Sequence, residues 1–307
     1  MKKTIWALLF FTISTIIFFS PTTNAQNEIE QKYPSLFWEI SKDSSTVSYL
    51  YGTMHSTDKR VHELSDSVTL IFEQCEAVAL ELIMDSVDMF GVMKGMFMQD
   101  TTLRMLYERD NYKKVKRYLK RQFLKNKELA LITLIFDIDK VKPMFLSTLV
   151  SESKPEDAAK LPLDMYLQEW GKKQNMTLIG IETFEEQMAA LDAIPLKQQA
   201  EMLLGQIELA ATSDSMNNQM MTLYLAQDLD GLLRFYEGFE GDMVSDSFDD
   251  ALIQKRNVVM AERMDKIMQE QKTFMAVGAL HLPGENGVLE LLRKKGYQVR
   301  PILKTVN

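Results

Sequence analysis

The apolar residues of this chain form short continuous runs near both ends and recur with helical spacing through the middle. Continuous runs are typical of strands that helices cover on both faces. Strands are predicted at residues 36–40, 47–51, 76–82, 176–181, 274–277 and 297–302, and the interior ones among them are nearly continuous in apolar residues. Strands that alternate with helical segments predict an α/β fold, in this case a mixed sheet flanked by helices.

The middle of the chain is helical in pattern almost throughout. We therefore predict a single domain over 26–307 that carries a mainly helical insertion at 83–175. Pro301 favours an edge position for the last strand, because proline cannot donate to a neighbouring strand. Further helices are predicted at 184–191, 196–213, 216–236, 249–271 and 287–295.

Residues 1–25 have the pattern of a signal peptide. Lys2 and Lys3 precede an apolar run at 5–20, and small residues end the segment at Ala25. The run is short for a membrane-spanning helix of roughly 20 residues, although an uncleaved anchor is the alternative. We expect an exported protein, periplasmic or extracellular. Its single cysteine, Cys75, can form no intramolecular disulfide.

The charge of the chain is acidic, with 35 basic and 43 acidic residues and a formal net charge of -8. An acidic surface disfavours nucleic acid and anionic membranes as partners, so we expect neither once the signal peptide is cleaved. It suits the binding of a cation. The sequence does not define the oligomeric state.

Two Gly-x-x-His segments follow strands in opposite halves of the chain. They are Gly52-Thr-Met-His55 and Gly278-Ala-Leu-His281. Glycine permits a tight turn, and the imidazole that follows can act as a metal ligand, a general base or a general acid. The alternative is that each histidine only forms hydrogen bonds within its turn. His62 lies in a polar loop, and we expect it to be exposed to solvent.

Carboxylates end two other predicted strands, at Glu81 and Glu182. A buried carboxylate needs a partner, and Arg256 could balance it or hold a substrate oxyanion. The alternatives are salt-bridged or helix-capping carboxylates and a surface arginine. Asp164 could likewise cap the helix after Pro162.

Ligands bind beyond the carboxyl ends of strands in sheets of this kind. We therefore expect His55, Glu81, Glu182 and His281 to share one site. Two imidazoles with one or two carboxylates resemble the ligands of a divalent metal that retains a water molecule. The chain has neither the His-Glu-x-x-His motif of zincins nor the Gly-x-Ser-x-Gly motif of serine hydrolases.

Seven segments in order resemble the TraB/GumN family, which is related to the Tiki proteases. They are Tyr49-Leu-Tyr-Gly-Thr-Met-His55, Leu64-Ser-Asp-Ser-Val68, Leu80-Glu-Leu82, Leu163-Asp164, Gly180-Ile-Glu-Thr-Phe-Glu-Glu-Gln187, Arg256-Asn257 and Ala276-Val-Gly-Ala-Leu-His-Leu282. The resemblance implies a metal-dependent, peptidase-like hydrolase, with manganese or cobalt favoured and zinc as the alternative. By the same resemblance His55, His281 and Glu81 hold the metal and form the catalytic core. Glu182, Asp164, Arg256 and Asn257 are further catalytic candidates.

Our hypothesis is an exported enzyme that hydrolyses a peptide or similar amide of a peptide or protein substrate. Metal-bound water would be the nucleophile, and Glu182 would shuttle the proton. One alternative is a protein of the same fold that binds and sequesters a peptide without turnover. The other is a metal-free, esterase-like hydrolase with one histidine as the base.

Overall fold

The computed structural model describes residues 31–42, 46–125, 136–151, 159, 161–208, 213–238 and 249–303. The expected signal peptide therefore lies outside the described residues. The chain divides into two compact units. A sheet unit takes in the described residues up to 86, from 154 to 187 and from 218 onward, and a helical unit takes in those at 87–153 and 188–217.

The sheet unit is built on six described strands in the order β4-β3-β5-β2-β1-β6. They are β1 (Phe37–Ser41), β2 (Ser48–Thr53), β3 (Ala77–Leu80), β4 (Thr177–Gly180), β5 (Thr273–Gly278) and β6 (Gln298–Pro301). β2, β5, β3 and β4 run parallel, whereas β1 is antiparallel to both of its neighbours. The predicted mixed α/β sheet is confirmed, and β6 with Pro301 does lie at an edge.

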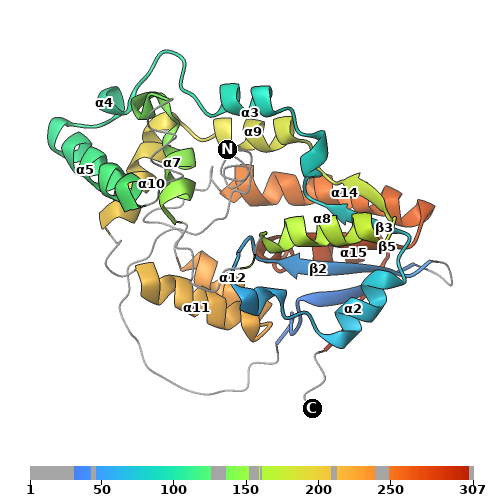
Figure 1. Ribbon diagram of the computed structural model, residues 1–307. Coiled ribbons are helices and arrows are strands. Elements are labelled where there is room, and N and C mark those ends of the chain that lie inside the picture. The colour runs from blue at the N-terminus through green and yellow to red at the C-terminus, as the bar shows by residue number, and fades with distance from the viewer. Residues whose placement is uncertain are drawn as a thin grey trace, which may run out of the picture. The chain divides into compact units, whose positions relative to one another are not determined.

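Helices cover both faces of this sheet (Figure 1). α2 (Asp66–Glu73) and α8 (Leu163–Lys173) lie on one face, and α14 (Lys255–Glu270) and α15 (Val288–Lys294) lie on the other. Phe72 of α2 stacks on Trp170 of α8 at 4.1 Å between ring centroids and meets Phe274 of β5 edge-on. The central strands are therefore buried on both sides, which explains their continuous apolar runs.

The remaining elements of the sheet unit are short. They are η1 (Lys59–His62), η2 (Met84–Ser86), α12 (Leu229–Glu237), the π-helical turn η4 (Asp250–Gln254) and η5 (Ala279–His281). α9 (Phe184–Asp192) and α11 (Ser213–Leu225) each contain a boundary between the two units. Two predicted helices are wrong in detail. The helix expected at 216–236 is broken at Gln227, whose φ is 58°, and the helix expected at 249–271 begins with the π-helical turn.

The helical unit corresponds to most of the predicted insertion together with part of the chain after α9. Its helices are α3 (Met89–Gly95), α4 (Leu103–Leu106), α5 (Arg109–Lys125), η3 (Ile138–Lys140), α7 (Pro143–Ser151) and α10 (Leu196–Glu208). Val115, Leu119 and Phe123 of α5 recur every four residues and are buried, so this basic helix is amphipathic. Between α7 and α10, Ser147 forms a hydrogen bond with Gln206.

Candidate metal centre

The four parallel strands end at the same edge of the sheet, and this brings the candidate residues together. His55 follows β2, His281 follows β5, Glu81 follows β3 and Glu182 follows β4. All four residues belong to the sheet unit. The four side chains expected at the strand ends therefore lie at one edge of the sheet.

The two Gly-x-x-His turns pack directly against each other at Gly52. A Cβ atom at this position would lie 3.1 Å from the Cα of Ala279, a backbone atom of the second turn. Tyr224 of α11 supports the first turn from outside, because its hydroxyl donates to the Gly52 carbonyl at 3.0 Å. Glycine at residue 52 therefore permits the close approach of the two segments, and a larger residue would have to displace the Ala279 backbone slightly.

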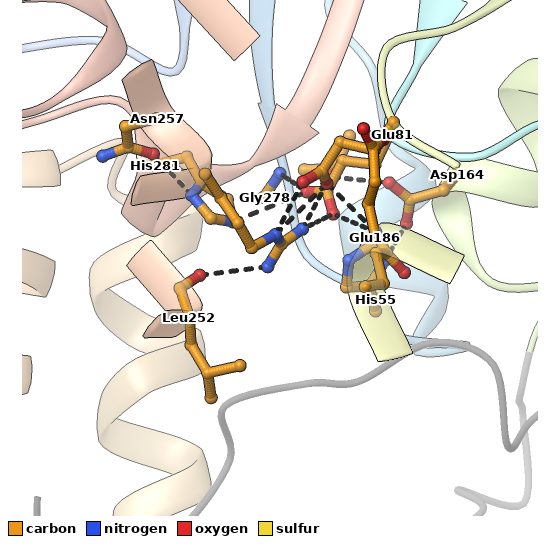
Figure 2. Close-up of polar contacts among 12 residues, drawn as sticks. His55, Glu81, Asp164, Glu186, Leu252, Asn257, Gly278 and His281 are labelled. Carbon is orange, nitrogen blue, oxygen red and sulfur yellow. Dashed lines mark hydrogen bonds and ion pairs between the residues drawn. The ribbon is translucent and has the colours of Figure 1, made fainter. Parts of the chain in front are cut away.

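Asp164 holds the first histidine in place (Figure 2). Nδ1 of His55 forms a short hydrogen bond with Asp164 Oδ2, while Asp164 Oδ1 accepts from the Thr53 hydroxyl at 2.6 Å. Burial opposes a charge on His55, but the Asp164 carboxylate outweighs burial and raises the pKa of the imidazole. The helix-cap interpretation of Asp164 is wrong. Pro162 precedes α8 without a side-chain cap, and Asp164 lies inside the first turn.

Asn257 holds the second histidine in a corresponding way, as Figure 2 shows. Nδ1 of His281 donates to Asn257 Oδ1 at 2.7 Å, and Asn257 Nδ2 donates to the backbone carbonyl of Asn286 at 2.9 Å. A carbonyl can only accept, so it fixes the orientation of the Asn257 amide and places the His281 proton on Nδ1. Burial, reinforced by the Arg256 charge, lowers the pKa of His281 to about 3, so the ring is neutral.

Arg256 bridges the two buried carboxylates at the ends of β3 and β4. Its Nη2 lies 2.8 Å from Glu81 and 2.6 Å from Glu182, and its Nε donates to Glu182 at 2.9 Å. Its Nη1 donates to the Leu252 carbonyl at 3.1 Å, which fixes the guanidinium from the other side (Figure 2). Arg256 thus lies between the carboxylates, as one of its predicted roles requires, and is not a surface residue.

The two carboxylates differ in electrostatics although they share this arginine. Burial tends to raise the pKa of Glu81, but Arg256, the two histidines and the Gly278 N–H outweigh burial and lower the pKa to about 2. The Gly278 N–H donates to Glu81 at 2.7 Å. For Glu182, burial and the Glu81 charge outweigh Arg256 and raise the pKa above its ordinary value. Glu182 is therefore the better proton acceptor of the pair.

Gln187 also contacts the site, although the sequence alone predicted no role for it. Its amide donates to Glu81 at 3.3 Å and to Glu182 at 3.2 Å. The start of α9 positions it through a capping box, in which the Thr183 N–H donates to Glu186 and the Glu186 N–H donates to the Thr183 hydroxyl. The sequence signal was the pattern Thr-x-x-Glu followed directly by glutamine.

Two other sequence-based interpretations can be compared with the structure. His62 is only partly exposed, because its ring packs edge-on against Tyr166 and its Nε2 lies 3.3 Å from the Ser56 carbonyl. The expectation of a solvent-exposed His62 is therefore wrong. Cys75 is buried, and burial raises the pKa of its thiol to about 11, which makes it a poor nucleophile.

The donor set suits a divalent metal in its chemistry. Both imidazoles direct Nδ1 to an oxygen of a neighbouring side chain. In metal sites with this arrangement the other ring nitrogen, Nε2, is the one that coordinates the ion. His281 Nε2 lies 3.9 Å from Glu81 Oε1. In the described part of the chain, no three His, Cys, Asp or Glu side chains are drawn together tightly enough to enclose an ion.

A model of the family described as TraB/PrgY/gumN matches residues 36–301, which include every residue of this site. The chain belongs to the TraB/PrgY/gumN family. Among curated relatives of this family member, the "Metalloprotease TIKI homolog" of Nematostella vectensis is 24% identical over 88% of this chain and 67% of its own length. "Metalloprotease TIKI1" of Xenopus tropicalis is 24% identical over 89% and 62%. "Metalloprotease TIKI1" of Homo sapiens is 24% identical over 92% and 66%.

The chain thus spans about two thirds of the length of these TraB/PrgY/gumN relatives. The relatives' printed names support a metal-dependent, protease-like family. Among the residues that the structure describes, we find no helix with the length and hydropathy needed to span a bilayer.

Proposed function

We propose that this protein is a metal-dependent hydrolase that cleaves peptide or similar amide bonds at the cluster of His55, His281 and Glu81. The observation that carries the proposal is the paired orientation of the histidines. Each imidazole is held through Nδ1, by Asp164 or by Asn257, so that Nε2 is the nitrogen that could bind a metal. The relatives are named metalloproteases, which supports metal-dependent hydrolysis of a peptide bond.

Manganese or cobalt is the proposed metal, with zinc as the alternative, and Glu81 supplies the third ligand. A bound divalent ion would activate water and polarise a carbonyl. Arg256 keeps Glu81 ionised by its charge, and Gln187 orients both carboxylates. Glu182, whose pKa is raised, takes a proton at its carboxylate and returns it to the leaving amine. We further propose that the protein is exported after removal of residues 1–25.

A peptide-sequestering protein is the second candidate, and one observation favours it. Both oxygens of Glu81 already accept hydrogen bonds, from Gly278 at one oxygen and from Arg256 and Gln187 at the other. A carboxylate satisfied in this way does not need a metal. The same residues could then bind a peptide without hydrolysing it.

Metal content separates these proposals. Untagged protein would be loaded with Mn²⁺, Co²⁺ or Zn²⁺, and the wild type compared with a His55→Ala/His281→Ala variant. The third histidine provides the matched control, His62→Ala, because its ring contacts the Ser56 carbonyl and the Tyr166 ring. Near-stoichiometric metal in the wild type and control, lost in the double variant, is the expected result.

The same three proteins would then be tested against a mixture of peptides, with and without a chelator. Cleavage that the chelator abolishes supports the hydrolase. Binding of metal and peptide without cleavage supports sequestration. Absence of metal from the wild type would refute the metal centre.

A further inference from the structure

A chain of hydrogen bonds leads from the π-helical turn η4 to the second histidine. Tyr236 of α12 donates to Asp249 Oδ1 at 2.9 Å, and Gln254 Nε2 donates to Asp249 Oδ2 at 2.5 Å. The side-chain amide of Asn286 then donates to Gln254 Oε1 at 3.1 Å. The backbone carbonyl of the same Asn286 accepts from Asn257, which binds His281.

The π-helical turn explains how Asp249 and Gln254 meet. These residues are five apart, and one π-helical turn places positions i and i+5 above each other, whereas an α-helix would place them on different faces. Tyr236 and Asp249 are both buried, so their hydrogen bond is shielded from water. The turn therefore has a fixed anchor immediately before Arg256 and Asn257.

Groups that can only accept hydrogen bonds set the direction of every hydrogen bond in this series. The Asp249 carboxylate accepts from Tyr236 and Gln254, so the Gln254 amide must turn its oxygen toward Asn286. Asn286 must then present its NH₂ group to Gln254. Its backbone carbonyl in turn orients the Asn257 amide.

We propose that Asp249, Gln254 and Asn286 are positioning residues that hold the loop after His281 and thereby keep the His281 proton on Nδ1. They act through Asn257, which needs the Asn286 carbonyl in place to present its oxygen to the ring. Their importance for hydrolysis rests on the proposed function, but the tautomer of His281 does not depend on it.

The test is nuclear magnetic resonance of chelator-treated, full-chain protein labelled with ¹⁵N at histidine. The chain has 3 histidines, so the ring-nitrogen signals are few enough to assign by substitution. In the wild type, His281 should carry its proton on Nδ1. Gln254→Leu and Asn286→Ala should each shift the ratio toward the Nε2-protonated form by roughly 2- to 10-fold, the range expected for one lost hydrogen bond.

The controls make the test specific. Gln269→Leu removes an amide-to-carboxylate bond to Asp265 on the same long helix, away from the site, and should leave the His281 ratio unchanged. Asn286 is exposed, so its substitution to alanine tests the idea even if the Gln254 variant fails to fold. Asp249→Asn should act like Gln254→Leu, because an amide no longer dictates the direction of the Gln254 bond.

Two results would overturn the proposal. One is a wild-type His281 protonated on Nε2, and the other is an unchanged ratio in both Asn286→Ala and Gln254→Leu. The affinity for Co²⁺ provides a second readout, with an expected loss of roughly 2- to 10-fold in the same variants. A shifted ratio in protein that binds no metal would leave the positioning role intact and refute the metal centre, so the two failures are distinct.

Discussion

Replacement of Arg256 by methionine should destabilise the sheet unit more than the loss of a solvent-exposed salt bridge would. The new side chain would be long and apolar, but it would leave the carboxylates of Glu81 and Glu182 without their cation. The side chains of these two carboxylates are only 9% and 2% exposed. Removing one partner of a buried ion pair typically costs about 3–5 kcal/mol, because the remaining charge is desolvated and unpaired. We expect a loss in this range.

A matched control is available on the same helix. Arg263 of α14 also binds a carboxylate, with Nη2 2.5 Å from Glu186, but the side chains of this pair are 35% and 40% exposed. Exposed pairs contribute about 0–1 kcal/mol. Arg263→Met should therefore cost about 1 kcal/mol, and the difference between the two variants should be roughly 3 kcal/mol.

The assay is urea unfolding followed by tryptophan fluorescence, after chelator treatment so that metal binding does not contribute. Trp38 and Trp170 both belong to the sheet unit, so the signal reports the unit that contains the site. A double-mutant cycle with Glu182→Gln measures how much of the loss comes from the Arg256–Glu182 pair. If Arg256→Met and Arg263→Met destabilise the protein equally, burial does not control the cost and our reasoning is wrong.

Three further results are expected. Gly52→Ala should cost about 1–3 kcal/mol in thermal unfolding, because the new Cβ would press on the Ala279 backbone; an unchanged melting temperature would show that the two turns can separate freely. Tyr224→Phe should cost about 1 kcal/mol in urea unfolding, since the Gly52 carbonyl loses its donor; equal stability would mean that another donor replaces the hydroxyl. The hydrogen bond from Arg263 lowers the pKa of Glu186 to about 2, whereas an unfolded glutamate titrates near about 4.3. The pair thus stabilises the fold above about pH 4.3 and loses this effect as the pH falls toward 2. In Arg263→Met the Glu186 pKa should return to its ordinary range, which a ¹³C-detected titration would measure.

The fold could be predicted because the signals that define it are local. The interior strands are nearly continuous apolar runs, and the runs that lead into the site end at a glycine or an acidic residue. Parallel strands end at one edge, so the strand ends alone were enough to group His55, Glu81, Glu182 and His281. The mixed sheet follows from the same pattern.

The partners of these residues could not be predicted, because each contact joins distant parts of the chain. Asp164 lies 109 positions from His55, and a carboxylate two residues after a proline is equally consistent with a helix cap. In the sequence Gln187 looks like an ordinary polar residue on a helix surface. Its contact with Glu81, which follows β3, becomes visible only in the fold. The π-helical turn before α14 has no distinct periodicity in so short a segment, so it was predicted as ordinary helix.

The position of β5 at the centre of the sheet has a consequence for biosynthesis. β5 pairs with both β2 and β3, and its first residue, Thr273, is hydrogen-bonded to Ser48, 225 positions earlier. The chain must therefore be synthesised through β5 before the middle of the sheet can close, and contacts this distant form slowly. Until then neither half of the site has its counterpart. A nascent chain that ends before Thr273 contains His55 and Glu81 but lacks the strand that pairs with both β2 and β3, so the candidate site cannot assemble until β5 has been made.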